Sequence, residues 1–354
     1  MFFFFSFFLS CLICFVLIKT VNLHGKLSFD SINGAQKFHQ KPTSRIGGLA
    51  IILTFIILLI FLESSYHEIF YIIILCSLPI VIAGFFEDLT KKASANFRLF
   101  STILSGILFT FMSGYNLENL QLNFIDNILS IYLISILFSG FAIGGVTNSI
   151  NIIDGFNGLA SGSLLIIFLG FMYIAWMIGD NLILYISMIM FSAILGFFVF
   201  NFPHGKIFLG DAGAYFCGYV LACTAVSLSV RNNNISPYAC FLLCSYPITE
   251  TMISIIRKTI RKGSHPNLPD SLHLHMLVYR SLSRKFSKYF DISDYRNPIT
   301  SIIMWGFPLA SLLFTIISYE NSILSVLFYF IILISYIFLY SKLSLINLFK
   351  KIYK

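Results

Sequence analysis

The sequence has 354 residues, of which 58% are hydrophobic and 11% are charged, and it carries a formal net charge of +8. A soluble globular domain has roughly 25% charged residues, so this composition excludes a soluble fold, and its apolar content excludes a disordered chain. The remaining class is an all-α, polytopic integral membrane protein. In such a protein the excess positive charge is typical of cytoplasmic loops, and we expect no nucleic acid as a partner.

Apolar runs of about 20 residues predict the transmembrane helices of one domain that covers residues 1–354. We predict eleven spans, at residues 2–18, 46–62, 69–86, 99–114, 128–146, 159–178, 182–200, 212–230, 237–256, 298–318 and 323–340. The first run has neither a basic segment before it nor a small-residue cleavage site, which favours a retained span over a signal peptide. The seven cysteines lie in apolar runs, and we interpret them as small buried hydrophobic residues.

The basic residues predict the orientation of these spans. When the spans alternate in direction, 22 of the 23 Lys and Arg residues fall on one side and only Arg231 falls on the other. Because basic loops stay in the cytoplasm, we expect the N-terminus outside and the C-terminus inside. The cytoplasmic catalytic loops are then 19–45, 87–98, 147–158, 201–211 and 257–297. They hold most of the Gly-rich and His-rich clusters, which places the expected chemistry on the cytoplasmic face.

The first of five such clusters is H-Q-K-P-T-S-R-I-G-G at residues 39–48. Lys41 and Arg45 are suited to holding phosphates, and the glycine pair allows a close approach of backbones. Taken alone, the segment favours an ordinary positively charged flank of a span.

The second cluster, at residues 84–92, ends the third span with the adjacent carboxylates of Glu87 and Asp88, and Lys91 follows one turn later. Neighbouring carboxylates repel, which raises a pKa or recruits a cation, so the pair can bind Mg²⁺ or take up a proton. The alternative is an interfacial loop anchored by lysines, and the position next to Gly-Phe-Phe favours function.

The third cluster, at residues 148–159, has no Lys or Arg. Asn148, Asn151, Asp154 and Asn157 recur every third residue, which predicts one shared face on a helix. Oxygen-rich side chains at this spacing suit a hard cation, or a polar ligand such as a base or sugar. A polar seam between helices is the alternative.

The fourth cluster, at residues 201–213, places Asp211 at the start of a span, where free N–H groups favour anions. Asp211 is either a simple helix cap or a Mg²⁺ ligand that brings phosphate towards those N–H groups, with Phe208 placed to stack on a base.

The fifth cluster contains His273 and His275, followed by Arg280. The two histidines would point the same way in an extended chain but not on a helix. Without Cys or an H-E-x-x-H motif, phosphate binding is favoured over zinc, and an amphipathic hairpin is the alternative. Glu250, inside the ninth span, is either functional or paired with a neighbour.

Together, the five clusters between about Lys41 and Arg280 resemble the polyprenyl-phosphate N-acetylhexosamine-1-phosphate transferases, which include the phospho-MurNAc-pentapeptide transferases. The resemblance implies about ten or eleven transmembrane helices with a cytoplasmic-face site in the bacterial inner membrane. It implies transfer of a sugar-1-phosphate from a UDP-N-acetylhexosamine to undecaprenyl phosphate with release of UMP, and Mg²⁺, or Mn²⁺ in its place, as the cofactor. The implied partners are these substrates and membrane lipids, and a homodimer is left open.

The resemblance also implies a role for each matching residue. The implied metal ligands are Asp211, in the F-x-G-D-x-G motif, and Asn151. The implied catalytic residues are Glu87, Asp88, Asp154, Asp211, His273 and His275. The implied substrate-binding residues are Lys41, Arg45, Lys91, Asn148, Gly155, Asn157, Phe208 and Arg280.

Three residues depart from the family pattern. Glu87 stands where the family usually has Asp, Met276 replaces a third His, and Asn157 replaces the commoner Asp. The stretches K-P-T-S-R-I-G-G and F-N-G-L-A favour the branch that initiates surface polysaccharides such as O-antigen, with UDP-GlcNAc as donor. The peptidoglycan enzyme is the alternative within the family, and a transporter or a non-catalytic scaffold is the alternative outside it.

Overall fold

The computed structural model describes residues 2–30, 42–260 and 272–352, and most of these residues are helical. The all-α membrane fold predicted from the sequence is confirmed. A short antiparallel ribbon, β1 (Phe29–Asp30) with β2 (Thr43–Ser44), pairs Phe29 with Ser44. The helices are α1 (Phe2–Lys19), α2 (Val21–Ser28), α3 (Gly48–Leu58), α4 (Ser64–Cys76), α5 (Leu78–Thr90), α6 (Ala95–Ser113), α7 (Asn123–Leu129), α8 (Tyr132–Ile153), α9 (Leu159–Ile178), α10 (Asn181–Asn201), α11 (Gly210–Arg231), α12 (Pro237–Leu243), α13 (Ser245–Ile260), α14 (Leu274–Val278), α15 (Arg284–Tyr289), α16 (Arg296–Met304), α17 (Gly306–Ser318) and α18 (Ser322–Ile352).

The apolar helices agree with the predicted spans. Among the described residues, eight helical segments are long and apolar enough to cross a membrane, and two bent pairs raise that number to ten. The predicted span 46–62 corresponds to the shorter apolar segment Gly48–Phe61, which is α3 with a final 3₁₀ turn. The count of eleven spans and their orientation stay predictions.

Two predicted spans are bent. The chain turns by 41° between α4 and α5 and by 78° between α12 and α13. Pro79 and Pro247 lie just after these bends, and proline has no N–H to bond the carbonyl four residues earlier. The second bend sets the direction of α13, the helix that carries Glu250.

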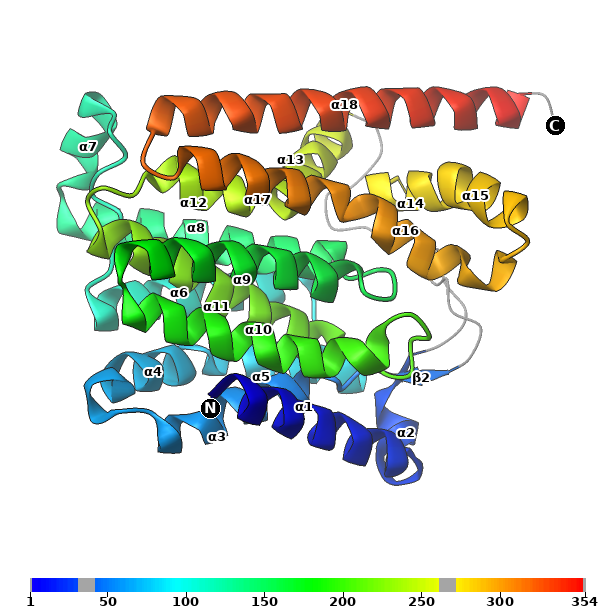
Figure 1. The fold of residues 1–354 in the computed structure, drawn as a ribbon, viewed down its shortest axis with the longest axis horizontal. Coiled ribbons are helices and arrows are strands. Elements are labelled where there is room, and N and C mark those ends of the chain that lie inside the picture. Colours follow the sequence, from blue (N-terminus) through cyan, green and yellow to red (C-terminus); the bar gives the residue numbers. More distant parts are fainter. Residues whose placement is uncertain (1, 31–41, 261–271, 353–354) are drawn as a thin grey trace.

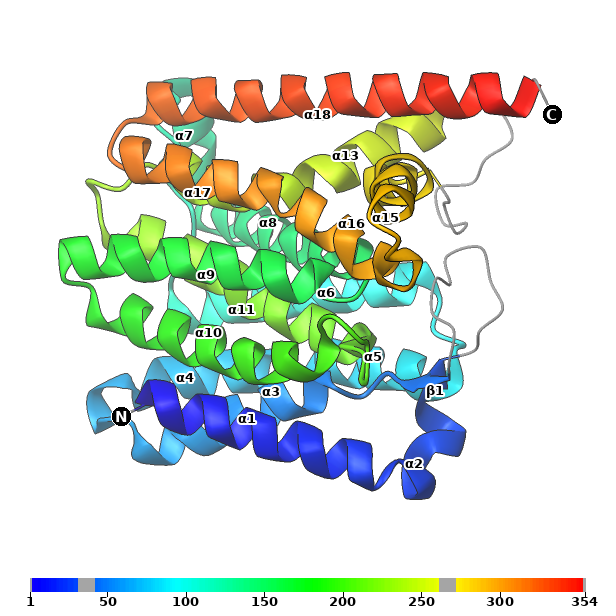
Figure 2. The ribbon, with the colours of Figure 1, turned by 45° about the vertical axis from the view of Figure 1, so that its right-hand side comes forward.

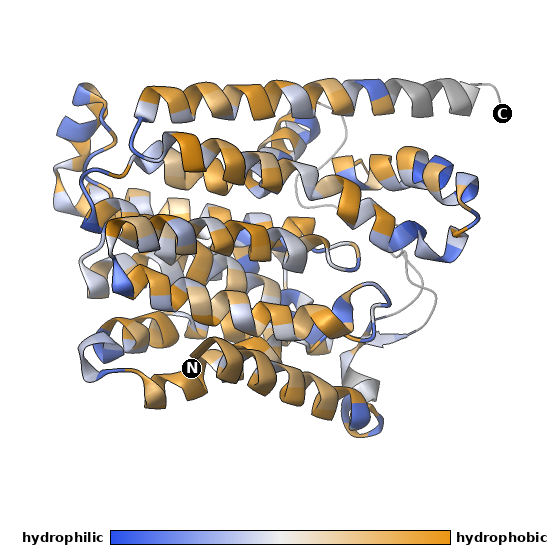
Figure 3. Ribbon diagram, viewed as in Figure 1, coloured by the Kyte–Doolittle hydropathy of each residue, from blue (hydrophilic) through white to orange (hydrophobic). Residues whose placement is uncertain are grey.

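The helices lie side by side, with connecting segments gathered at two ends (Figures 1 and 2). The β1–β2 ribbon, the α8–α9 and α10–α11 turns and the α14–α15 segment share one end, which we call the ribbon end. The opposite end holds α7 and the α9–α10 and α17–α18 turns. Hydrophobic residues cover the helix bodies, while hydrophilic residues concentrate near the two ends (Figure 3).

Helix α11 is the centre of the bundle, because 83% of its apolar window is buried, against 17% for α1 and for α18. Small residues let its neighbours approach closely. Gly213 packs against Gly48 of α3, and Ala212 packs against Gly84 of α5. A Cβ on Gly48 or on Gly84 would collide with the α11 backbone. These contacts bring the first turn of α11, the start of α3 and the end of α5 to one place at the ribbon end.

Candidate active site

Asp88 binds the first turn of α11. It lies one turn after Gly84 in α5, and it is fully buried. Because Gly84 packs against Ala212, the Asp88 carboxylate reaches the start of the neighbouring helix. Its Oδ1 accepts a hydrogen bond from the Asp211 N–H at 2.8 Å, and its Oδ2 accepts one from the Ala212 N–H at 3.0 Å. The anion expected at this helix start is therefore the protein's own carboxylate.

Two guanidinium groups hold the side chain of Asp211. Arg45 Nη2 donates to Asp211 Oδ1 at 2.8 Å, and Arg98 Nη1 donates to Oδ2 at 2.5 Å. Arg45 also lies 3.6 Å from a carboxylate oxygen of Asp88 and 3.6 Å from one of Asp30. Burial disfavours the charged guanidinium, but these carboxylates outweigh that cost and raise the pKa of Arg45.

Arg98 and Asp30 were not among the predicted site residues. In the sequence, Arg98 is one of three basic residues in the loop 87–98, where the positive-inside rule already accounts for it. Asp30 lies in loop 19–45 with no motif around it. The contact of both residues with the site depends on chain segments that are distant in sequence, so local patterns carry no signal for them.

Backbone hydrogen bonds place Arg45 beside the start of α11. The Phe208 N–H donates to the carbonyl of Ser44 at 2.8 Å, and the Gly47 N–H donates to the carbonyl of Phe208 at 2.9 Å. Gly210 adopts a φ of +76°, and a Cβ there would collide with the carbonyl oxygen of Arg45. The glycine before Asp211 in the F-x-G-D-x-G motif is therefore required by this close approach.

The third cluster does not form one helical face. Helix α8 ends at Ile153, so Asn148 and Asn151 are helical while Asp154 and Asn157 lie in the following turn. The prediction that all four share a face is wrong, because the chain leaves the helix at Asp154, whose ψ is 72°.

Asn157 joins the α8–α9 turn to its neighbours. Its Nδ2 donates to the carbonyl of Pro203 at 2.9 Å, and its backbone N–H donates to Asn297 Oδ1 at 2.8 Å. Asn201 Oδ1 accepts from the N–H of Gly158, which has a φ of +78°. The third and fourth clusters therefore contact each other, while the role of Asn157 in binding uracil stays a prediction.

Asp154 belongs to the same electrostatic cluster as Asp211. Removal from water raises the pKa of Asp154 to about 7, although Arg45 opposes the shift, and the Asp211 carboxylate adds to it. Four carboxylates, those of Asp30, Asp88, Asp154 and Asp211, act on the Arg45 guanidinium.

The donor chemistry of this cluster fits a hard divalent cation. Asp211 and Asn151 offer the oxygen ligands that Mg²⁺ prefers, and Mg²⁺ commonly takes only one or two carboxylates and completes its shell with water and substrate phosphates. Within residues 2–30, 42–260 and 272–352, no three His, Cys, Asp or Glu side chains form a ready-made metal centre. The assignment of Asp211 and Asn151 as metal ligands stays a prediction.

The two acidic residues of the second cluster have different surroundings. Glu87 Oε2 accepts a hydrogen bond from the Ala93 N–H at 2.8 Å, whereas Asp88 binds the first turn of α11. Lys91 ends α5 with a φ of 56°, and its Nζ donates to the carbonyl of Phe29 at 2.8 Å. Both side chains hold the loop after α5 in place. Lys41, predicted to bind phosphate, lies outside the described residues.

The predicted histidines meet Glu250. Glu250 Oε1 accepts from His273 Nδ1 and from the Leu274 N–H, both at 3.0 Å, and Glu250 Oε2 lies 3.9 Å from His275 Nδ1. The two imidazole rings stack with centroids 5.2 Å apart, so they point the same way even though His275 is helical. Arg280 lies half-buried in the π-helical turn that follows α14.

His275 also contacts the α8–α9 turn. Its ring packs edge-on against Phe156 with centroids 5.7 Å apart, and a Cβ on Gly155 would lie 3.5 Å from its Nε2. The third and fifth clusters therefore meet, and all five predicted clusters contribute residues to the ribbon end.

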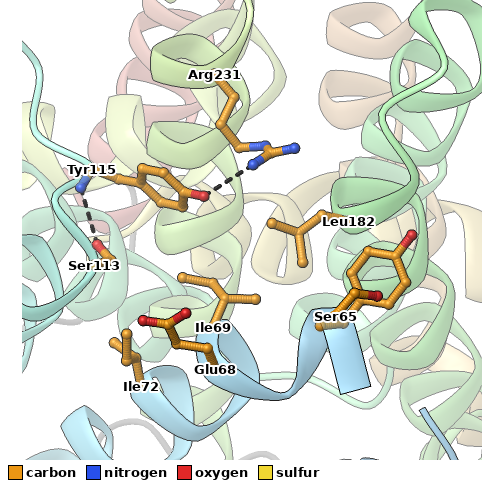
Figure 4. Close-up of a pocket in the computed structure, with 9 residues that line it drawn as sticks. Ser65, Glu68, Ile69, Ile72, Ser113, Tyr115, Leu182 and Arg231 are labelled. Carbon is orange, nitrogen blue, oxygen red and sulfur yellow. Dashed lines mark hydrogen bonds between the residues drawn. The ribbon is translucent and has the colours of Figure 1, made fainter. Parts of the chain in front are cut away.

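A separate pocket of about 300 Å³ lies at the opposite end, between α4, α6, α10 and α11 (Figure 4). Its Arg231 donates to Tyr115 Oη at 3.0 Å and to Asp180 Oδ2 at 3.0 Å. Since Asp180 already neutralises Arg231, this pocket offers no free cation for an anionic substrate. It shares no lining residue with the ribbon-end cluster.

Comparisons with known proteins agree with this arrangement. The profile of glycosyl transferase family 4 matches residues 69–229, which include Asp88, Asp154 and Asp211. The probable undecaprenyl-phosphate N-acetylglucosaminyl 1-phosphate transferase of Bacillus subtilis is 28% identical over 258 residues, which cover 71% of this chain and 70% of that protein. The phospho-N-acetylmuramoyl-pentapeptide-transferase of Lactobacillus johnsonii is 26% identical over 288 residues, 76% of this chain and 88% of that protein. The enzyme of that name from Streptococcus thermophilus is 38% identical, but over only 36% of this chain and 38% of its own length. These matches confirm the resemblance to the polyprenyl-phosphate N-acetylhexosamine-1-phosphate transferases, glycosyl transferase family 4, that the motifs predict.

Proposed function

We propose that the protein transfers N-acetylhexosamine-1-phosphate, with GlcNAc favoured, from a UDP-sugar to undecaprenyl phosphate and releases UMP. The names of the relatives support the coarser class, a polyprenyl-phosphate sugar-1-phosphate transferase. The observation that carries the proposal for this chain is the meeting of Arg45, Asp88 and Asp211 at the ribbon end. The reaction would initiate a surface polysaccharide, such as O-antigen or another cell-envelope glycan, at the cytoplasmic face of the inner membrane.

The proposed chemistry exchanges one phosphoanhydride bond for another. An oxygen of the lipid phosphate attacks the β-phosphorus of the UDP-sugar and forms the new P–O bond. The bond from that phosphorus to the bridging oxygen breaks, and UMP leaves with the oxygen. The attacking phosphate is already anionic, so the protein has mainly to position the two substrates and to offset their mutual repulsion.

Arg45 and Arg98 are the proposed phosphate-binding groups of the core site. Guanidinium groups form paired hydrogen bonds with phosphate as they do with carboxylate. In the structure both groups contact Asp211, which holds them in place at the start of α11. Asp211 and Asn151 are the proposed ligands of Mg²⁺, and the bound ion would supply neutralisation of the diphosphate charge.

The remaining site residues keep the roles that the motifs predict. Glu87, Asp88, His273 and His275 are proposed catalytic residues that surround the reacting phosphates. With its pKa raised to about 7, Asp154 can carry a proton near neutral pH and donate it in a hydrogen bond, as a uracil carbonyl would require. The other proposed substrate-binding residues are Lys41, Lys91, Asn148, Gly155, Asn157, Phe208 and Arg280.

The phospho-MurNAc-pentapeptide transferase reaction is the second candidate function. The Lactobacillus and Streptococcus relatives carry that name, and the second of these is the more identical over the segment it matches. Met276 in place of a third histidine favours the GlcNAc reaction, and the choice between the two donors is a matter for assay.

UMP release tests the proposal directly. The detergent-solubilised protein is given undecaprenyl phosphate, Mg²⁺ and either UDP-GlcNAc or UDP-MurNAc-pentapeptide. We expect UMP from UDP-GlcNAc, and we expect Asp211→Asn or chelation with EDTA to abolish it. Asp180→Asn, which removes a buried carboxylate at the opposite end, is the matched control and should keep its activity. UMP from the pentapeptide donor alone would establish the second candidate, and no UMP from folded protein across a wider panel of UDP-sugars would refute the proposal.

A further inference from the structure

We infer that Glu250 is a positioning residue, whose buried carboxylate holds His273 and His275 with the Nε2 edge of His275 turned towards the α8–α9 turn. The inference rests on the proposed function, because it assigns Glu250 to the histidines that this reaction would use. It also supplies a role for Glu250, which the sequence left as either functional or paired with a neighbour.

The position of Glu250 is unfavourable for a charged side chain. It is fully buried in α13, within a bent pair of helices apolar enough to span a membrane. An ionised carboxylate in such a place is strongly disfavoured unless several hydrogen bonds compensate it. The histidine segment provides two such hydrogen bonds, and a bend of 78° before Ser245 sets the direction of α13.

The hydrogen bonds of Glu250 fix the orientation of one ring and constrain the other. Oε1 accepts from both His273 Nδ1 and the Leu274 N–H at 3.0 Å. An ionised carboxylate only accepts, so the hydrogen on His273 lies on Nδ1, and Nε2 of the neutral ring is left as an acceptor. His275 stacks on this ring with an interplanar angle of 4°, and its Nδ1 faces Glu250 Oε2 at 3.9 Å.

A second anchor on the same helix supports this interpretation. Arg257 lies two turns after Glu250, and residues seven apart share a helix face. Its Nη1 donates to the carbonyl of Leu272 at 2.9 Å and to Tyr340 Oη of α18 at 2.9 Å. One face of α13 therefore holds the histidine segment at two points. Arg257 binds the carbonyl of Leu272, and Glu250 binds the His273 ring and the Leu274 N–H.

Other groups around Glu250 are phenols. Tyr246, one turn earlier in α13, and Tyr336 of α18 both interact electrostatically with the carboxylate. Neither phenol carries charge near neutral pH. Among the described residues, the charged groups that act on Glu250 are the two histidines when they are protonated.

The variant Glu250→Gln tests the inference. Glutamine keeps the size of the side chain but removes the charge, and its amide NH₂ replaces an oxygen that faces an imidazole. Loss of the outer partner of a metal-ligating histidine typically costs about 10–100-fold, and by analogy we expect kcat for UMP release to fall by a factor in that range with little change in KM for the UDP-sugar. Glu250→Asp keeps the charge and should keep kcat closer to its wild-type value.

A readout that needs no turnover separates this inference from the proposed function. Nitrogen chemical shifts of ¹⁵N-histidine protein, with His273 assigned by His273→Gln, report which ring nitrogen carries hydrogen. We expect the Nδ1–H form in the wild type and in Asp180→Asn, and a shift towards Nε2–H in Glu250→Gln. If no UDP-sugar gives UMP yet this shift occurs, the proposed function fails while Glu250 still positions the ring. An unchanged tautomer, or a loss of activity in Glu250→Gln that only matches its loss of folded protein, would overturn the inference.

Discussion

Asp88 is expected to stabilise the fold as well as to serve the reaction, and the variant Asp88→Asn separates these contributions. The carboxylate accepts two backbone hydrogen bonds from the first turn of α11, from Asp211 at 2.8 Å and from Ala212 at 3.0 Å. Asparagine has one oxygen, so its NH₂ group must face one of the two N–H donors. That donor is left without a partner in a fully buried place.

The size of the effect follows from the bonds that are lost. A hydrogen bond to a charged group contributes about 1.5–3 kcal/mol, and an anion at a helix start contributes a further 0.3–1 kcal/mol or so. We therefore expect Asp88→Asn to lower the free energy of unfolding by about 3 kcal/mol. Each kcal/mol shifts the melting temperature by roughly 2 °C in a chain of this size, so the melting temperature should fall by about 6 °C.

Thermal unfolding in detergent and UMP release are measured on the same preparations. Glu87→Gln is the matched control, since Glu87 is half-buried and accepts a hydrogen bond from the Ala93 N–H, and its variant should shift the melting temperature by less than about 2 °C. A residue that served only as a proton acceptor in a crowded acidic cluster would behave in the opposite way, because its removal relieves repulsion. Asp88→Asn with an unchanged or raised melting temperature would therefore refute the capping role.

Three further changes test other parts of the structure. Arg98→Ala removes a guanidinium that lies 2.5 Å from the Asp211 carboxylate, and we expect at least a tenfold loss of UMP release; full activity would contradict its proposed role in phosphate binding. Gly48→Ala should abolish or severely reduce folding, because its Cβ would collide with the α11 backbone, whereas Gly145→Ala, whose Cβ meets open space, should melt like the wild type. Burial opposes ionisation of Asp180, but the hydrogen bonds from Arg231 outweigh it and lower the pKa of Asp180. The stability it adds is thus present above the ordinary aspartate pKa of about 3.9, so Asp180→Asn should melt earlier at pH 7, with the difference vanishing as the pH falls below 4.

The helical membrane fold was predictable because the bilayer fixes the length of an apolar helix, and composition alone excluded the other classes. The bends within the predicted spans 69–86 and 237–256 were not predicted, because hydropathy averaged along a run carries no information on direction. Pro79 and Pro247 were the available signals for these bends.

The meeting of the five clusters was predictable from their shared side of the membrane, but their pairings were not. The motifs placed Asp88 and Asp211 at one surface, and the structure adds that the first binds the backbone of the second. That contact depends on the packing of Gly84 against Ala212, two residues separated by more than 120 positions, and no local pattern encodes which glycine meets which helix. The prediction that residues 148–157 share one helical face was wrong because a local pattern was trusted too far. Their spacing of three matches a helix, but α8 ends at Ile153.

The capping of α11 by Asp88 affects how the site would bind phosphate under the proposed function. A free helix start attracts anions to its backbone N–H groups, but Asp88 already accepts from two of them, those of Asp211 and Ala212. The positive charge left for an anion is that of Arg45 and Arg98, and both guanidinium groups are held in place by Asp211. A substrate phosphate that reaches them meets donors whose positions are already fixed, so little side-chain entropy is lost on binding. Under the proposed function, Asp211 would have two tasks, to orient the arginines before the substrate arrives and to offer its remaining lone pairs to the proposed Mg²⁺.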